Sequence, residues 1–409
     1  MKKLVMITIV ALLAGCGGSD DDSKIRLTFW QFWTSPDVKP TIESLIAEYE
    51  QAHPEIEIDL VDLTWSDGHE KIVIAFSTGS APDIVELGSD WIGEFALKGV
   101  ITDLTDFHDS ASSDLMMWEP ARVDGKVYAV PWLLGTRVLF YNKDLLDLAG
   151  IGTKEGPRTW DQLLDYSTRI SNLELGVPVY GFGSNSAERH RLYKKFLPFL
   201  WSNGGAILSE DGTVSLLDQP EAIAALEYYV SLSDAGYMES QRGLDDKFLA
   251  GELGFIISGD WLLRRIANQS PQFDVGTALI PTPDTSDVSV SFAGGEYLTL
   301  NSQSKQKREA LKFISYLVAE DADYDFCNAV GSPTPANRGA ASRILSEADS
   351  LSETFLRQIE TARTPPVHPE WVHIEEILEK AVEKAIYHKS TPASALGTAR
   401  SEIDKLLVK

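Results

Sequence analysis

The sequence predicts an α/β fold, and three observations support this prediction. Short apolar segments that suit β-strands alternate along the chain with amphipathic segments that suit helices. Several helical segments each connect two such strands, as βαβ units do. The 409 residues are 44% hydrophobic and 24% charged, so the chain can fill two or three domain-sized cores and has the composition of an ordinary globular protein.

The alternation is clearest near the start of the chain. In the first expected helix, Ile42, Leu45 and Tyr49 recur at helical spacing. Pro54 ends this helix, because a proline disfavours helical geometry in the residue before it. Strands are expected at 25–32, 55–63 and 83–87, with helices between them at 38–53 and 69–77.

The rest of the chain continues the pattern less regularly. Thr159 and Gln162 have the spacing of a capping box and predict the start of a helix at 159–171. Asp124 and Gly125 predict a turn. Further strands are expected at 126–132, 137–142, 253–258, 274–280 and 297–300, and further helices at 188–201, 220–234, 245–249 and 305–318, with two more in 371–407.

The chain is strongly acidic, with a formal net charge of -25 at pH 7. Because a polyanion repels phosphate backbones, we expect no nucleic acid partner. The seven His residues form no convincing metal set, since His368 and His373 are five apart and do not share one helix face. Motifs of the Walker A, Gly-x-Gly-x-x-Gly and Gly-x-Ser-x-Gly types are absent from the sequence. We therefore expect neither a metal nor a cofactor, and we expect Cys327 to be a buried apolar residue.

The N-terminus resembles that of a bacterial lipoprotein. Two lysines precede an apolar segment at 4–13 that is too short to span a bilayer, and 13–16 (LAGC) resembles a lipobox. We expect a signal peptide at 1–15, lipidation of Cys16, and a flexible acidic tether at 16–23. The lipid would anchor the protein to the membrane at the cell envelope, on the periplasmic or extracellular side. A plain secretory signal or an apolar N-terminal helix is the alternative.

Seven short motifs occur in order along the chain. They are 81–85 (APDIV), 124–131 (DGKVYAVP), 139–145 (LFYNKDL), 157–163 (PRTWDQL), 201–205 (WSNGG), 248–261 (FLAGELGFIISGDW) and 292–295 (FAGG). Together they resemble family 1 extracellular solute-binding proteins, the maltose-binding-protein-like receptors of ABC sugar importers. Seven collinear matches, covering nearly all of residues 25 to 405, are far more specific than any one of them.

The resemblance implies a two-lobed periplasmic-binding-protein fold of type II, with a hinge that the chain crosses more than once and a ligand cleft between the lobes. The lobes are expected at 24–134 plus 289–336 and at 137–288 plus 337–409. The resemblance also implies a monomeric receptor that is not an enzyme. Such a receptor closes around a mono- or oligosaccharide and delivers it to the permease of an ABC transporter.

A sugar ring has an apolar C–H face and a rim of hydroxyls, so its site needs flat aromatic side chains and planar polar groups. Trp30, Gln31 and Trp33 end the first expected strand. Since neighbours in a strand face opposite ways, we expect either Trp30 or Gln31 to face the ligand and the other to face the core. Asp90 and Trp91 follow the third strand, where the resemblance implies a carboxylate that binds sugar hydroxyls. The alternative for Asp90 is a helix cap.

Further candidates come from the second half of the chain. Asp260 and Trp261 open a helix, and the resemblance implies that the indole stacks on sugar; core packing is the alternative. Gly294 and Gly295 would let the backbone approach a ligand, with Glu296 as a hydroxyl acceptor, or would form a bulge at the hinge. The remaining candidates for ligand contacts are Trp132, Arg137, Asn203 and Trp371.

Two other functions stay open at this point. A surface glycosidase could use two of Asp90, Asp260 and Glu296 as an acid and base pair, although nothing near them in the sequence indicates raised pKa values. The same fold could instead bind a polyamine, a peptide or another polar solute. Many cleft carboxylates and few stacking aromatics would indicate a cation, and the number of tryptophans among the candidates favours sugar.

Overall fold

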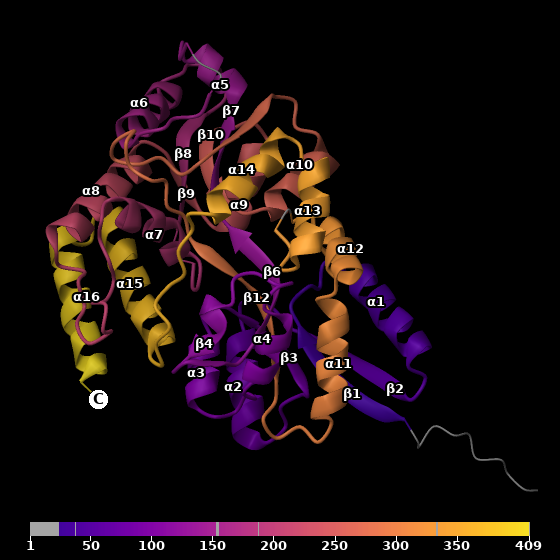
Figure 1. Ribbon diagram of the computed structural model, residues 1–409. Helices are drawn as coiled ribbons and strands as arrows, with labels where there is room; N and C mark the ends of the chain where they lie inside the picture. The colour runs from indigo at the N-terminus through magenta and orange to yellow at the C-terminus, as the bar shows by residue number, and fades with distance from the viewer. Residues whose placement is uncertain (1–23, 37, 153–154, 187, 333, 409) are drawn as a thin grey trace, which may run out of the picture.

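The protein is described here by a computed structural model. It covers residues 24–408, apart from 37, 153–154, 187 and 333. The predicted signal peptide, lipidation site Cys16 and tether lie outside the described residues. The chain folds into two α/β lobes, each built on a five-stranded sheet. Figure 1 shows the lobe with the N-terminal strands at the bottom, which we call the first lobe, and the second lobe above it.

The first sheet has the strand order β2-β1-β3-β12-β6. β1 runs parallel to β2 and β3, whereas β12 runs antiparallel to β3 and β6. The carboxyl ends of β1 and β3 therefore lie at the same edge as the amino end of β12. The elements of this lobe are β1 (Ile25–Gln31), α1 (Lys39–Ala52), β2 (Ile56–Asp62), α2 (Gly68–Thr78), β3 (Ile84–Gly88), α3 (Ile92–Leu97), α4 (Thr105–Ala111), β4 (Arg122–Val123), β5 (Lys126–Val127), β6 (Val130–Thr136), β12 (Ala293–Leu300), α11 (Lys307–Leu317), α12 (Glu320–Val330) and α13 (Arg338–Glu347).

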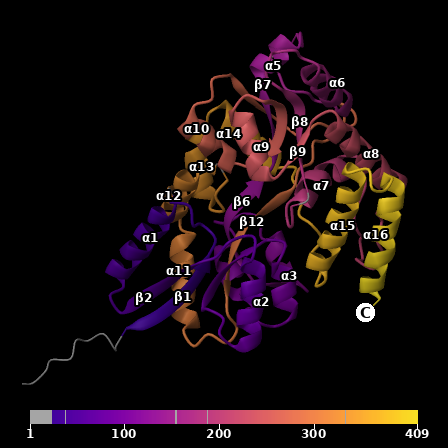
Figure 2. The ribbon, with the colours of Figure 1, turned by 180° about the vertical axis from the view of Figure 1, so that it is seen from behind.

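The second sheet has the strand order β11-β7-β10-β8-β9. β8, β9 and β10 run parallel, and β7 runs antiparallel to its neighbours β10 and β11. Its elements are β7 (Val138–Asn142), α5 (Lys143–Leu148), α6 (Trp160–Ser171), β8 (Tyr180–Asn185), α7 (Leu192–Ser202), α8 (Pro220–Asp234), β9 (Tyr237–Glu239), α9 (Gln241–Leu249), β10 (Leu253–Ser258), α10 (Trp261–Gln269), β11 (Val275–Ala278), α14 (Ser350–Ile359), α15 (Trp371–Ile386) and α16 (Pro392–Leu407). Figures 1 and 2 both show α15 and α16 packed beside α7 and α8.

Each lobe has its own buried core. In the first lobe, Phe29 of β1 packs against Phe313 of α11, with 5.9 Å between the ring centroids, and Cys327 of α12 is fully buried, as predicted. In the second lobe, Phe199 of α7 packs against Tyr229 of α8 at 5.5 Å. Burial of these apolar side chains drives folding of each lobe. Helices cover the sheets, so the strand ends remain for a functional site.

Three crossings of the described chain join the lobes. The first runs from β6 to β7 and the second from β11 to β12. They lie side by side, because the Thr136 hydroxyl donates to the Phe292 carbonyl (2.9 Å). The third follows α13, since Ile344 lies in the first core whereas Phe355 of α14 packs in the second lobe. The boundary predicted at 336/337 therefore falls too early, because α13 packs against α12.

Most predicted elements are present, with ends shifted by a few residues. Thr159 caps α6 as predicted, with its hydroxyl accepting from the Gln162 N–H (3.3 Å). The single strand predicted at 126–132 is wrong: β5 pairs with β4 in a separate two-stranded sheet before β6 begins. β8 was missed because glycines weaken the strand pattern of its sequence YGFGSN. In the described part of the chain, no helix has the length and apolar character needed to cross a bilayer.

Candidate functional site

The two lobes face each other across the ends of their strands. The first lobe contributes the carboxyl ends of β1 and β3 and the amino end of β12, and the second contributes the carboxyl end of β10 and the amino end of β7. Ligands of α/β sheets bind at such strand ends. Four residues predicted from the sequence are brought together there, namely Arg137, Asp260, Trp261 and Glu296.

Arg137 lies at the first crossing and covers part of Trp261. Its guanidinium carbon is 4.7 Å from the indole centroid, which is a cation–π contact. Burial lowers the pKa of Arg137, while the nearby carboxyls of Asp260 and Glu296 oppose this shift. An arginine stays charged under these conditions, so Arg137 supplies a fixed positive charge opposite two acidic residues.

The carboxyl groups of Asp260 and Glu296 come from different lobes. Burial raises the pKa of Glu296 to about 8, with a further contribution from Asp260 and opposition from Arg137. Burial also raises the pKa of Asp260, although Ser332 donates a hydrogen bond to it. The sequence around Asp260 and Glu296 gave no sign of these raised pKa values, because the groups that act on the two carboxyls are distant in sequence. Glu296 is largely protonated at neutral pH and can both donate and accept hydrogen bonds.

The Trp261 indole has a fixed orientation. It is half-buried at the start of α10, and its Nε1 donates to Asp245 Oδ2 (2.9 Å). The other oxygen of Asp245 accepts from Gln241 (2.8 Å) and from Ser258 (3.0 Å). Asp245 thus holds the polar edge of the indole and is itself held by Gln241 and Ser258, while the half-buried ring keeps some accessible surface.

The end of β1 holds two partly exposed tryptophans around a buried amide. Gln31 is the buried neighbour of Trp30, and its Nε2 donates to Asp62 Oδ1 (2.7 Å). The Gln31 Oε1 accepts from the backbone N–H of Trp33, whose ring packs edge-on against Phe326 at 5.5 Å. Gln31 therefore supports the strand end, whereas Trp30 and Trp33 keep accessible surface near it.

Three other predicted tryptophans are core residues here, contrary to the prediction. Trp91, Trp132 and Trp371 are 1%, 0% and 1% exposed. Trp132 stacks on Phe326 with 4.5 Å between centroids, and Trp371 packs edge-on against Tyr193 at 5.7 Å. A large indole gains most when all its surface leaves water, and its place in the sequence does not show which layer it will occupy. These indoles offer no face to a ligand in this conformation.

Asn203 and the glycine pair make their contacts within the protein. Asn203 follows the last turn of α7, and its Nδ2 donates to a backbone carbonyl of α8 (2.8 Å). A Cβ on Gly295 would lie 2.2 Å from the Leu133 carbonyl oxygen, and one on Gly294 would meet an aromatic ring at 2.6 Å. The neighbouring backbone therefore requires glycine at 295, whereas a side chain at 294 would require the Phe292 ring to move. The pairing of β12 with β6 shifts register after Glu296, as the bulge alternative predicts.

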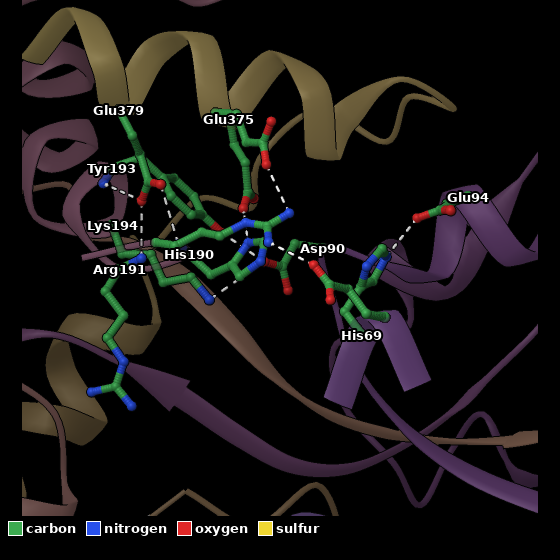
Figure 3. A network of polar contacts seen from close by, with 12 residues as sticks. His69, Asp90, Glu94, His190, Arg191, Tyr193, Lys194, Glu375 and Glu379 are labelled. Atoms are coloured by element: carbon green, nitrogen blue, oxygen red, sulfur yellow. Dashed lines mark hydrogen bonds and ion pairs between the residues drawn. The ribbon is translucent and has the colours of Figure 1, made fainter. Parts of the chain in front are cut away.

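Asp90 follows β3 in the first lobe, but its partners come from the second lobe (Figure 3). The Tyr193 hydroxyl donates to Asp90 Oδ2 (2.6 Å), and Lys194 Nζ lies 3.4 Å from the same oxygen. The cap position of α3 is Trp91, without a side-chain cap bond, so Asp90 is not the helix cap considered above. Burial opposes ionisation of Asp90, but Lys194 and Tyr193 outweigh it and hold its pKa below the ordinary value.

The residues of α7 and α15 that lie around Asp90 in Figure 3 were not among the predicted site residues. Glu379 accepts the N–H groups of His190 (3.1 Å) and Arg191 (3.0 Å) and so caps the start of α7. The His190 ring contacts Glu375. Burial raises the pKa of Glu379 to about 7, with a contribution from Glu375. These partners are at least 185 residues apart, so no local pattern could have marked them.

A groove of about 510 Å³ opens beside this network and has walls from both lobes. The first lobe contributes His69 and Glu94, and the second contributes Arg189 and Glu376. Arg189 bridges the groove by pairing with Glu70 (3.1 Å) and Glu376 (2.7 Å). Among the residues that the structure describes, no cluster of His, Cys, Asp or Glu is arranged to hold a metal ion.

Comparison with known proteins settles the family. The family model described as bacterial extracellular solute-binding protein matches residues 33–324, which is most of the chain. This chain is a bacterial extracellular solute-binding protein. The predicted resemblance is thereby confirmed. Relatives of this solute-binding protein include the diacetylchitobiose binding protein DasA of Streptomyces coelicolor, 26% identical over 97% of this chain and 96% of DasA, and the maltodextrin-binding protein MdxE of Bacillus subtilis, 26% identical over 87% and 85%.

Solved structures support the two-lobed fold of the solute-binding protein. An ABC transporter solute-binding protein of Thermotoga lettingae, solved with α-D-tagatose, superposes with a TM-score of 0.84 at 24% identity, covering 94% of this chain and all of the other. The GacH receptor of Streptomyces glaucescens superposes with a TM-score of 0.81 at 22% identity, covering 94% and 98%. At these identities the likeness concerns the fold alone, and the predicted fold class is confirmed.

Proposed function

We propose that this solute-binding protein is an extracytoplasmic receptor that captures a mono- or oligosaccharide between its lobes by hinge closure and delivers it to the permease of an ABC transporter. One observation carries the proposal: the half-buried Trp261 indole is held by Asp245 at the strand ends, with Asp260 beside it. Glu296 faces this group from the first lobe. The function makes and breaks no bond.

The chemistry of these groups suits a sugar. The accessible part of the Trp261 indole can stack on the C–H face of a pyranose ring. Asp260 can accept hydrogen bonds from hydroxyls, and a protonated Glu296 can donate to one hydroxyl and accept from another. Arg137 adds planar donors next to the indole. Together these groups match an apolar ring face with a polar rim.

The division of the site between the lobes supports hinge closure. Asp260 and Trp261 belong to the second lobe and Glu296 to the first, so a sugar reaches all of them only when the lobes approach. Binding then shifts the population toward the closed form. Direct contacts of this kind give dissociation constants near the micromolar range, or about 8 kcal/mol.

Relatives support sugar over other polar solutes. DasA is named for diacetylchitobiose and MdxE for maltodextrin, and a Rhizobium radiobacter relative, 24% identical over 83% of this chain, is named a lactose-binding protein. We extend to this chain only the shared class, a carbohydrate. We also propose that Cys16 carries a lipid that anchors the receptor to the membrane, and that the receptor acts as a monomer.

A thermal-shift screen of mono- and oligosaccharides on the purified protein tests the proposal. We expect a stabilisation that grows with the concentration of the cognate sugar. Trp261→Ala should abolish this shift without unfolding the protein, whereas Tyr387→Ala, at an exposed aromatic after α15, should leave it intact. If no sugar up to the millimolar range stabilises the protein, the proposal fails and polyamines and peptides become the ligands to screen.

The raised pKa values of Glu296 and Asp260 favour a glycosidase as the alternative function, since a general acid needs a protonated carboxyl. The two functions differ in the fate of the bound oligosaccharide. A receptor returns it intact after long incubation, whereas a glycosidase releases shorter products. Chromatography of the incubated oligosaccharide panel separates these outcomes.

A further inference from the structure

We propose that Asp90, Tyr193 and Lys194 form a clasp that holds the two lobes together. In this role Asp90 sets ligand affinity by stabilising the closed form and does not itself contact the ligand. The part of this inference that concerns affinity rests on the proposed function. The clasp itself does not, because all of its contacts are between protein groups.

The geometry of the clasp crosses the interface between the lobes. Asp90 lies directly after β3, and Tyr193 and Lys194 lie in the first turn of α7. Both side chains of α7 reach the same carboxylate oxygen, Asp90 Oδ2, at 2.6 and 3.4 Å. A sugar hydroxyl that used this oxygen would compete with a phenol and an ammonium group that are already in place.

Burial makes these contacts strong. The Asp90 side chain is 4% exposed, Tyr193 is fully buried and the Lys194 side chain is 18% exposed. The pKa of Asp90 lies below its ordinary value, so the carboxylate is ionised and its bonds are charge-assisted. Away from water such bonds gain strength, whereas their loss leaves a charge without partners.

The second-lobe half of the clasp is fixed in advance. Glu379 of α15 accepts three backbone N–H groups at the start of α7, including that of Tyr193 (3.4 Å). The Tyr193 ring packs edge-on against the buried Trp371, at 5.7 Å. The phenol therefore points at Asp90 because of contacts within its own lobe, and little entropy is lost when the lobes meet.

A second contact between the lobes is weaker. Arg189 of the second lobe pairs with Glu70 of α2, but their side chains are 46% and 64% exposed. Surface ion pairs of this kind contribute little, because water screens them. The buried contacts of Asp90 with Tyr193 and Lys194 therefore hold the lobes together more strongly than the ion pair between Arg189 and Glu70.

A clasp and a ligand contact predict different patterns of affinity. Removing a clasp lowers the closed population and weakens every ligand that needs closure by one common factor. Removing a ligand contact weakens most the sugars that carry the contacted hydroxyl, and weakens little the deoxy or epimeric sugars that lack it. The pattern over a panel of related sugars thus separates the two roles.

The test uses Asp90→Asn, Tyr193→Phe and Lys194→Met in the full chain. Tyr228→Phe is the matched control, because the Tyr228 hydroxyl donates to the Trp160 carbonyl within the second lobe (2.7 Å). Thermal melts identify any variant that fails to fold, and Tyr193→Phe keeps the ring that packs on Trp371. Small-angle X-ray scattering of the unliganded proteins should give a larger radius of gyration for the three clasp variants than for wild type and the control.

Calorimetry with the sugar panel then completes the test. Within each clasp variant, the affinity for every sugar of the panel should fall by one common factor, which should be about tenfold for Asp90→Asn. An unchanged radius of gyration, or a loss confined to sugars with one particular hydroxyl, would overturn the clasp. If wild type binds no sugar at all, the proposed function fails while the scattering result alone decides the clasp.

Discussion

The guanidinium of Arg137 lies over the indole of Trp261, 4.7 Å from the ring centroid, although the two residues are far apart in the chain. They meet because β7 and β10 pair antiparallel, with Val138 opposite Ser258, so that the residue before β7 and the start of α10 share one strand edge. The arginine thereby joins the hinge to the residue on which the proposed sugar stacks.

Arg137→Met should weaken sugar binding about tenfold. The substitution removes the cation–π contact with the Trp261 indole and the positive charge beside the carboxyls of Asp260 and Glu296. Arg137→Lys should lie between wild type and this variant, since lysine keeps the charge but not the planar fork. Isothermal calorimetry measures the effect. Arg400→Met, at an arginine paired with Asp218 on the surface of the second lobe, is the control and should bind sugar like wild type.

Glu296→Gln should flatten the pH dependence of stability. The folded-state pKa of Glu296 is about 8, above its ordinary value of 4.5, so the folded protein holds a proton that the unfolded chain releases. The free energy of unfolding from this group therefore falls as the pH rises from about 4.5 to about 8. Urea unfolding at both ends of this range should show a smaller fall for Glu296→Gln than for wild type. Equal slopes would contradict the prediction, and Glu43→Gln on the surface of α1 should keep the wild-type slope.

Gly295→Ala should destabilise the first lobe by about 1–3 kcal/mol, because the new Cβ would lie 2.2 Å from the Leu133 carbonyl oxygen and push β12 away from β6. Gly397→Ala is the matched control. Apart from the nearby backbone of α16 itself, no atom of the described residues lies within 4 Å of a Cβ added there, and alanine favours the interior of α16 by about 1 kcal/mol. The free energy of unfolding, measured by chemical denaturation, should thus fall for Gly295→Ala and rise for Gly397→Ala.

Glu379→Ala should destabilise the second lobe by about 1–3 kcal/mol, because the N–H groups of His190 and Arg191 lose their acceptor at the start of α7. Hydrogen exchange of the first turn of α7 should become faster in the same variant. Glu383→Ala, one turn further along α15 and paired only with Lys389 among the ion pairs described, should change neither quantity.

Local chemistry explains which features could be predicted from the sequence. The cap at Thr159, the apolar stripe of α1 and the helix that opens at Trp261 depend on neighbours within a few residues. Whether a tryptophan lies in a core or at a ligand site depends instead on residues distant in the sequence. Trp132 and Trp371, which the sequence predicts as ligand contacts, therefore lie in the cores. The partners of Asp90 are more than a hundred residues away, and their meeting depends on how one lobe docks on the other.

The three crossings of the chain also bear on how the molecule could come apart. A protease that cut the segment between α13 and α14 would leave the lobes joined by two covalent connections, from β6 to β7 and from β11 to β12. The hydrogen bond from Thr136 to the Phe292 carbonyl would still link these two connections. A single nick would therefore release neither half, and the clipped protein should run as one particle on a sizing column. With paired connections side by side, sliding and twisting are restricted, so bending about their common line is the easiest motion left to the halves.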